Sequence, residues 1–241
     1  MKDSYLKYLS KSKKATKEYY LSSFDKTQQQ IFLESILEGK FNVKNKFTIA
    51  DIACGAGTLS YHLDNIFVNS SFTLCDYNEF ALESCRELCK ENNFTITKEN
   101  MYSLPYESKS YDMTFCWQSI SFIDKPNDAI KELIRITKKG GYIYMSLLCN
   151  LDYSVDIYSK VRDHSRESDH FVNYNTFSKE TIQNWIDSKV ESYRFYPFNI
   201  KKELKKKSNG IGTHTLQLIN NKYIQVSGGQ LLNWAILEIE V

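Results

Sequence analysis

The sequence of 241 residues predicts an α/β protein whose mostly parallel sheet carries helices on both faces. Two observations support this class. Short β-branched segments alternate with segments of helical periodicity over residues 47–148. A glycine-containing turn follows the first strand-like segment, where sheets of this kind bind a ligand beyond the carboxyl ends of their strands. Right-handed crossovers between parallel strands would distribute the helices over both faces.

The elements of the alternating region follow from the periodicity of apolar residues and from the residues that typically begin or end a helix. Residues 1–40 read as a helical segment that ends near Gly39. Asn78 suits the N-cap of a later helix, and Pro126 suits the first turn of another, which Lys138–Gly141 would close. The expected strands are 47–53, 71–75, 94–97, 111–116 and 142–148, and the helices between them are 58–67, 78–92 and 126–137.

The C-terminal part begins with residues 149–177, which are polar and aromatic and have no clear period. A long irregular segment after a sheet strand is typical of a functional cover. We expect one domain over residues 1–241, and its expected parts are a helical cover (1–40), a ligand-binding core (47–148) and a substrate cover with C-terminal strands (149–241). Within the last part we expect a helix at 178–188, strands at 193–198 and 235–241, and a hairpin of 213–219 with 223–226.

Composition excludes several classes of function. The formal net charge of +2 gives no global reason to expect a nucleic-acid partner. No apolar stretch approaches the roughly 20 residues that span a bilayer, and the N-terminus lacks the features of a secretory signal. We therefore expect a cytoplasmic protein without a membrane partner. Six cysteines match no zinc spacing, so reduced thiols and no metal site are expected.

The segment Asp51-Ile-Ala-Cys-Gly55-Ala-Gly57 lies where the first strand passes into the first helix. Two glycines let the backbone turn sharply and approach a ligand closely. Ser60 replaces the third glycine of the dinucleotide fingerprint, and no Gly-Lys-Ser/Thr follows, so a P-loop is excluded. Asp76 ends the second strand, where a carboxylate can bind both hydroxyls of a ribose. An ordinary tight turn and an acid at a helix N-terminus are the structural alternatives.

These motifs, with Asn100-Met-Tyr-Ser-Leu-Pro and Cys116-Trp-Gln-Ser, resemble the class I S-adenosylmethionine (SAM)-dependent methyltransferases of the small-molecule type from about Phe47 to Leu148. The resemblance implies a Rossmann-like sheet of seven strands with antiparallel C-terminal strands. It also implies SAM as cofactor and S-adenosylhomocysteine as its product. Asn100 stands where the family often has an aspartate on the adenine amino group. The cofactor-binding residues implied are Asp51, Ala53, Cys54, Gly55, Gly57, Asp76, Tyr77, Asn100, Met101, Cys116, Trp117 and Gln118.

Within that resemblance, the glycine turn holds the methionine end of SAM, Asp76 holds the ribose and Tyr77 packs on adenine. Methyl transfer needs mainly alignment of donor and acceptor, and a base is required only where the acceptor loses a proton. His164 in the cover and Tyr20 in the N-terminal segment are the candidates for that base. His170, in the same cover, and Tyr19, beside Tyr20, are the alternatives.

The predicted function is methyl transfer from SAM to an oxygen or nitrogen of a small polar metabolite. A sugar or a cell-surface polysaccharide precursor is one candidate, because the tyrosines of residues 149–177 can stack on sugars. An RNA-modifying methyltransferase is an alternative, motivated by the lysines of Lys201–Lys207, and a non-catalytic SAM-binding protein is another. The expected partner is a small-molecule acceptor, and the expected state is a monomer or a homodimer.

Overall fold

The computed structural model describes residues 25–165, 171–186, 188–207 and 209–241. The expected N-terminal helical segment can therefore be compared with the structure only from residue 25 onward. There it contains the helix α3 (Gln28–Lys40), which begins at a capping box. Thr27 accepts the backbone N–H of Gln30, and the Gln30 side chain accepts the backbone N–H of Thr27.

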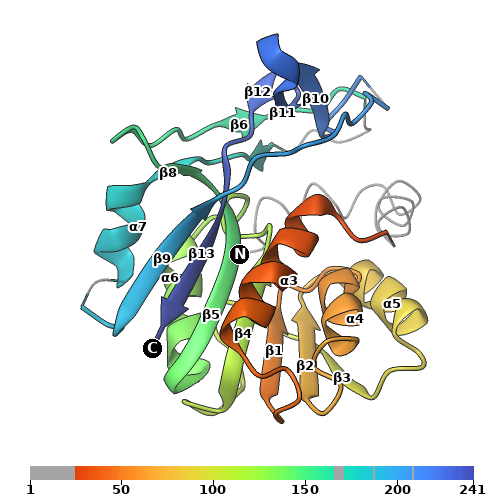
Figure 1. The fold of residues 1–241 in the computed structure, drawn as a ribbon, viewed down its shortest axis with the longest axis vertical. Coiled ribbons are helices and arrows are strands. Elements are labelled where there is room, and N and C mark those ends of the chain that lie inside the picture. The colour runs from red at the N-terminus through yellow and green to blue at the C-terminus, as the bar shows by residue number, and fades with distance from the viewer. Residues whose placement is uncertain (1–24, 166–170, 187, 208) are drawn as a thin grey trace.

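The main sheet confirms the predicted fold class (Figure 1). Its strand order is β3-β2-β1-β4-β5-β13-β9, and β8 pairs with β5 off this path. Neighbours from β3 to β5 are parallel, whereas β13 is antiparallel to both β5 and β9. Its strands are β1 (Thr48–Ile52), β2 (Ser71–Asp76), β3 (Phe94–Lys98), β4 (Tyr111–Trp117), β5 (Thr137–Asn150), β8 (Phe177–Ser178), β9 (Ser192–Pro197) and β13 (Trp234–Glu240).

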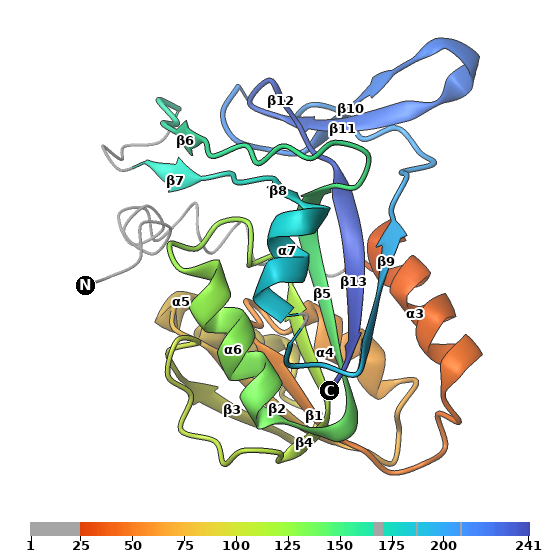
Figure 2. The same cartoon turned by 90° about the vertical axis from the view of Figure 1, so that its left-hand side faces the viewer.

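Helices cover both faces of this sheet. Figure 2 shows α6 and α7 on one side of β5 and β13, and α3 on the other. The buried apolar side chains divide in the same way. Leu33 and Leu37 of α3 pack with Leu59 and Leu63 of α4 over one face, whereas α6 and α7 bury their isoleucines on the opposite face. The helices that follow α3 are α4 (Thr58–Asp64), α5 (Glu79–Leu88), α6 (Pro126–Ile136) and α7 (Lys179–Ile186).

Two of the predicted helix starts are confirmed. The Asn78 side chain accepts the backbone N–H of Phe80 at 3.1 Å and caps α5, and Pro126 stands in the first turn of α6. α6 ends at Ile136, one residue before the predicted end. The expectation that Lys138–Gly141 close the helix is wrong, because these residues belong to β5. Gly140 has a φ of +73° and its N–H bonds to the Val241 carbonyl. Pairing with the last strand thus overrides the local preference for a turn.

The cover over the sheet contains more strand structure than its composition indicates. The predicted hairpin is confirmed as β10 (His214–Gln217) and β11 (Tyr223–Ser227). A third strand, β12 (Gln230–Leu231), extends it, and a separate short pair joins β6 (Lys160–Val161) to β7 (Val172–Asn173). No helix in the described part of the chain is long and apolar enough to cross a membrane.

Candidate functional site

The turn after β1 is held in an unusual backbone conformation. Ala53, Gly55 and Gly57 all have positive φ, at 58°, 58° and 74°. Ala53 is not a glycine, so its left-handed conformation costs about 1–2 kcal/mol. The Cys54 N–H bonds to the Cys75 carbonyl at 2.9 Å and so ties the turn to β2. Strained backbone of this kind persists where the surrounding structure over-determines it, and it is enriched at ligand sites.

Asp76 binds directly to this turn. The N–H of Gly55 donates to Asp76 Oδ2 at 2.9 Å, and the N–H of Asn78 donates to Oδ1 at 2.8 Å. An ionised carboxylate has about four acceptor positions, so Asp76 keeps acceptor capacity beyond its bonds to the backbone. Burial raises the pKa of Asp76, and the N–H groups of Asn78, Gly55 and Tyr77 oppose that rise. The carboxylate is therefore fixed in place and still able to accept a hydrogen bond from a ligand hydroxyl.

Asp51 supplies a second acid beneath the same turn. Its side chain is 1% exposed, and the Ser60 hydroxyl donates to its Oδ2 at 2.7 Å. Its Oδ1 has no hydrogen-bond partner among the residues that the structure describes. Burial raises the pKa of Asp51 to about 7, the Ser60 bond lowers it, and the charge of Asp76 adds to the rise. A cation beside these two acids would stabilise both carboxylates.

The loops after β2 and β3 contain the predicted adenine-side residues. Asn100 Oδ1 accepts the Tyr102 N–H at 3.1 Å, so this oxygen already has a partner in the local turn. Tyr77, directly after Asp76, is 41% exposed, and Met101 packs against the hydrophobic core. The Tyr102 hydroxyl accepts N–H groups from the loop after β4. The two loops are therefore linked at the carboxyl edge of the sheet.

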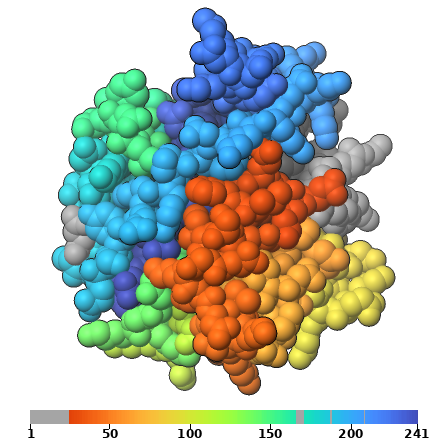
Figure 3. All heavy atoms as spheres, in the orientation of Figure 1, coloured from red at the N-terminus to blue at the C-terminus, as the bar shows by residue number. Residues whose placement is uncertain are grey.

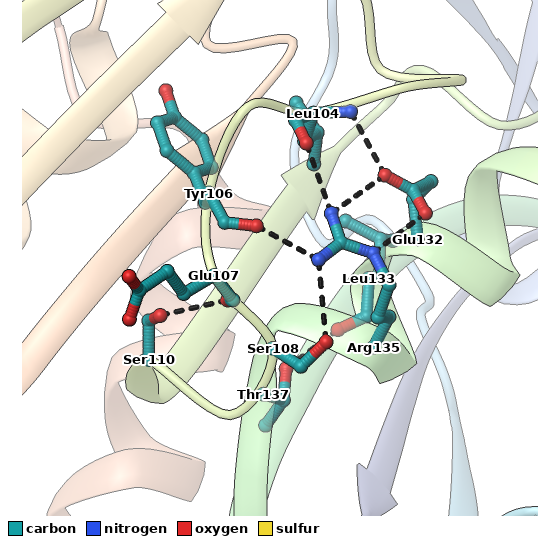
Figure 4. Close-up of polar contacts among 9 residues, drawn as sticks. All are labelled: Leu104, Tyr106, Glu107, Ser108, Ser110, Glu132, Leu133, Arg135 and Thr137. Carbon is teal, nitrogen blue, oxygen red and sulfur yellow. Dashed lines mark hydrogen bonds and ion pairs between the residues drawn. The ribbon is translucent and has the colours of Figure 1, made fainter.

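Arg135 on α6 fixes the rest of that loop (Figure 4). Its guanidinium donates to the carbonyls of Leu104 and Tyr106 at 3.0 and 2.8 Å. Glu132, one turn earlier on α6, pairs with Arg135 at 2.8 Å and accepts the Leu104 N–H at 2.8 Å. A planar guanidinium can serve several oxygens at once. The ion pair thus holds the loop by both its N–H and its carbonyl groups.

The end of β4 separates three of the predicted cofactor-binding residues. Cys116 is wholly buried in the core, and burial raises the pKa of its thiol. Trp117 packs on the opposite face, with the α3 cluster. Gln118 is exposed and has a φ of +50°. Its Nε2 donates to Oε1 of Gln29 on α3 at 2.7 Å, so α3 is bonded to the turn after β4.

The candidate bases fall in different places. Tyr20, Tyr19 and His170 lie outside the residues that the structure describes. His164 is exposed in the turn after β6. Asp163 in that turn accepts the Ile211 N–H at 2.9 Å, which ties the turn to the segment before β10. No described contact brings His164 to Asp51 or Asp76.

Sequence reasoning missed three contributors to this site. In the sequence, Ser60 stands out only as a missing glycine, although its hydroxyl holds Asp51. The Glu132–Arg135 pair has the spacing of an ion pair on one helix face, and that signal could have revealed it. Gln29 gave no signal, because its burial arises from the packing of α3. Among the described residues, no group of three or more histidine, cysteine, aspartate or glutamate side chains could hold a metal ion.

Comparisons with known proteins agree with this geometry. The family model described as "Methyltransferase domain" matches residues 50–145. An uncharacterized methyltransferase of Schizosaccharomyces pombe is 33% identical over 110 residues, which are 42% of this chain and 40% of that protein. Malonyl-[acyl-carrier protein] O-methyltransferase 2 of Ilyobacter polytropus is 26% identical over 150 residues, covering 60% and 55%. The matches thus span about half the length of these relatives, or less.

Solved structures support the fold over a larger share of the chain. The PH0226 protein of Pyrococcus horikoshii has a TM-score of 0.57 at 17% identity and covers 92% of this chain and 98% of its own. The YcgJ protein of Bacillus subtilis also has a TM-score of 0.57, at 14% identity, with coverage of 89% and 99%. Likeness at such identity concerns the arrangement of the backbone. The sheet and its covering segments therefore have counterparts in other proteins.

Proposed function

We propose that this chain, whose residues 50–145 match the methyltransferase domain model, is a class I SAM-dependent methyltransferase that transfers a methyl group from SAM to an oxygen or nitrogen of a small polar metabolite. The observation that carries the proposal is the bond from the Gly55 N–H to Asp76 Oδ2. It joins the backbone turn after β1 to the carboxylate after β2. These are the two features that a nucleoside and its attached amino-acid chain would need side by side.

The residues fit the cofactor in charge and in hydrogen bonding. Asp76 would accept the ribose hydroxyls through its remaining acceptor positions, and the turn at Gly55 and Gly57 would hold the methionine portion. Asp51, with its buried Oδ1, would favour the positive charge of the bound group. When bound, SAM supplies an electrophilic methyl group on its sulfonium. The chain's own part is to orient that group and to exclude water around it.

A polar acceptor is supported by the groups near the end of β4. Gln118 is exposed there, and Asn173 of β7 donates to Asp124 at 2.8 Å in the loop that follows. The N–H of Asn175 bonds to the Ser121 carbonyl at 2.9 Å, so the cover is attached to this same loop. A sugar or a cell-surface polysaccharide precursor remains our candidate. His164 and Tyr20 remain the proposed bases for an acceptor that must lose a proton.

Methyl-labelled SAM tests this function directly. Purified chain is incubated with labelled SAM and the small-molecule fraction of a cell extract, and S-adenosylhomocysteine and labelled product are measured. We expect turnover with the small-molecule fraction and, at a limiting SAM concentration, strongly reduced turnover with Asp76→Ala. Asp128→Ala, an exposed acid on α6, is the matched control and should keep full turnover.

The other outcomes separate the alternatives. Label that enters only an RNA fraction, and disappears after nuclease treatment, would favour RNA modification. One matched relative is a ribosomal RNA small subunit methyltransferase C of Buchnera aphidicola, 28% identical over 144 residues. Cofactor binding without turnover on any fraction would favour a non-catalytic SAM-binding protein.

A further inference from the structure

A basic and apolar surface at the far end of the cover is not used by the proposed function. We call it the hairpin surface. It combines exposed lysines of the segment before β10 with exposed apolar side chains of the hairpin. Its members are Lys201, Lys202, Lys205, Lys206, Lys207, Leu216, Leu218, Ile219 and Lys222.

The charge of this region is concentrated and uncompensated. Residues 201–222 contain six lysines and one acidic residue, Glu203, so their net charge of +5 exceeds the +2 of the whole chain. None of the six lysines forms an ion pair with any residue that the structure describes. Unpaired lysines concentrated on one surface attract an anionic partner.

The apolar side chains stand at the tip of the same feature. Ile219 is 86% exposed, and Leu216 and Leu218 are 49% and 47% exposed. Ile219 lies in the tight turn between β10 and β11, where Asn220 and Asn221 take positive φ. Figures 1 and 3 show this hairpin rising above the sheet as a narrow projection. Ile219 is therefore placed where it can enter an apolar phase.

Backbone pairing keeps the lysines beside the hairpin. The Thr215 N–H bonds to the Leu204 carbonyl at 3.0 Å, and the Leu204 N–H bonds to the Thr215 hydroxyl at 2.9 Å. The lysine segment is thus bonded to β10 at Thr215. Five lysines lie within three positions of Leu204, so positive charge and apolar tip belong to one structural unit.

We propose that the hairpin surface binds the surface of an anionic membrane, with Ile219 and Leu218 entering the interface and the lysines contacting lipid headgroups. Apolar side chains bordered by lysine are the composition that binds anionic bilayers peripherally. A projecting tip offers little area to a folded protein, whose stable interfaces bury roughly 800 Å² on each side. Residues 201–222 contain no arginine and no Phe, Tyr or Trp, which single-stranded nucleic acid would use for stacking.

The position of the hairpin relates this contact to the rest of the molecule. β12 leads into β13, whose Trp234 pairs with Leu148 near the carboxyl end of β5. The hairpin surface therefore lies beyond the same edge of the sheet as the turn at Gly55. A membrane bound there would face the end of the sheet at which the cofactor is proposed to bind. The contact is peripheral, and no spanning segment is required.

Vesicle sedimentation tests the proposal with the full chain. We expect the protein to sediment with vesicles of equal parts phosphatidylcholine and phosphatidylglycerol and to stay in solution with phosphatidylcholine alone. Reversing two charges with Lys205→Glu/Lys206→Glu should weaken the partition at least about tenfold. Ile219→Ser should weaken it severalfold, because an apolar group leaves the interface.

Control variants test whether vesicle binding depends on this surface or on the charge and exposed apolar side chains of the whole protein. Lys44→Glu/Lys46→Glu changes the same charge at exposed positions before β1, and Val68→Ser removes a side chain that is 66% exposed. Both should sediment as the unaltered chain does. The proposal is overturned if the protein does not sediment with anionic vesicles, or if the control variants lose binding as much as the hairpin variants do. It is also overturned if single-stranded RNA binds the hairpin surface and vesicles do not. None of these readouts depends on methyl transfer.

Discussion

The side-chain amide of Gln118 donates a hydrogen bond to the amide oxygen of Gln29, 2.7 Å away and 89 positions earlier in the chain. This bond joins α3 to the strained turn after β4, where Gln118 has a φ of +50°. Gln29 is 3% exposed, and its Nε2 has no partner among the described residues. The bond therefore stabilises the approach of α3 to the proposed site.

Removing this bond should destabilise the fold measurably. Gln118→Ala leaves the buried Gln29 oxygen without its donor, which costs about 1–3 kcal/mol in the free energy of unfolding. Urea titration measures the change. Gln217→Ala is the control, because Gln217 forms an exposed bond to Asn221 and should cost less than about 0.5 kcal/mol. Equal effects of both substitutions would contradict the assigned role.

Cofactor affinity should depend on Asp76 and Gly55. Asp76→Ala removes a charged acceptor, and we expect S-adenosylhomocysteine to bind at least about tenfold more weakly. Gly55→Val places a β-branched side chain at a φ of +58°, where it is strained, and should also weaken binding strongly. Calorimetric titration gives the affinity, and circular dichroism checks that both variants fold. Unchanged affinity in both variants would mean that the cofactor binds elsewhere.

The raised pKa of Asp51 predicts a pH dependence of stability. Folded Asp51 keeps its proton until about pH 7, whereas its ordinary pKa is 3.8. Between these values the unfolded chain binds fewer protons, so this group lowers the free energy of unfolding as pH rises. Asp51→Asn removes that loss. The free energy of unfolding of this variant relative to wild type should therefore rise by up to about 3 kcal/mol from pH 5 to pH 8.

Urea unfolding at several pH values measures this difference. Ser60→Ala is the informative companion, because it removes the bond that lowers the pKa of Asp51. In Ser60→Ala, the free energy of unfolding should keep falling with rising pH to a higher pH than in wild type. A difference between Asp51→Asn and wild type that does not vary with pH would refute a raised pKa.

The Arg135 contacts predict a local effect on one loop. Arg135→Ala leaves the carbonyls of Leu104 and Tyr106 without their donor and the Glu132 carboxylate without its cationic partner, and should cost about 1–3 kcal/mol in the free energy of unfolding. Hydrogen exchange at the Leu104 amide should accelerate, since Glu132 then loses its fixed position. Lys131→Ala, which removes only an exposed pair with Asp128, should change little. Retained protection at Leu104 would show that Arg135 does not hold the loop.

Gly57 is required for packing as well as for its conformation. A Cβ at this position would lie 2.6 Å from the Cys85 sulfur, so Gly57→Ala should destabilise by about 2 kcal/mol or more. Adding Cys85→Ala should recover the steric part and leave about 1 kcal/mol from the positive φ. Gly39→Ala is the control, because a Cβ at Gly39 would meet no atom within 4 Å. A double mutant as unstable as Gly57→Ala alone would exclude the clash.

The part of the site that sequence reasoning predicted depends on strand order. Gly55 and Asp76 follow adjacent parallel strands, and the carboxyl ends of such strands lie together. The Gln29–Gln118 bond could not be predicted, because it depends on how Leu33 and Leu37 seat α3 on the sheet. The positions of polar residues such as these show no periodicity from which the packing of a helix could be predicted.

The start of β5 shows the same limit of prediction from sequence, here for the fold. Lys138, Lys139 and the two glycines have the composition of a helix end, and nearby sequence favours a turn. The pairing of Gly140 with Val241, 101 positions away, decides otherwise. Gly141 also fits because a Cβ there would meet the Asp112 carbonyl oxygen at 2.8 Å. Contacts between distant segments thus decided what local propensity could not.

The position of β13 has a consequence for how the protein is made. This strand follows β5 and β9 in the chain, yet it lies between them and pairs with both. During synthesis, the edge of β5 that pairs with β13 stays unpaired while about ninety further residues leave the ribosome. A nascent chain stopped before Trp234 would expose that edge, which is a template for aggregation. Chaperone contact at this stage would protect the growing chain until the missing strand arrives.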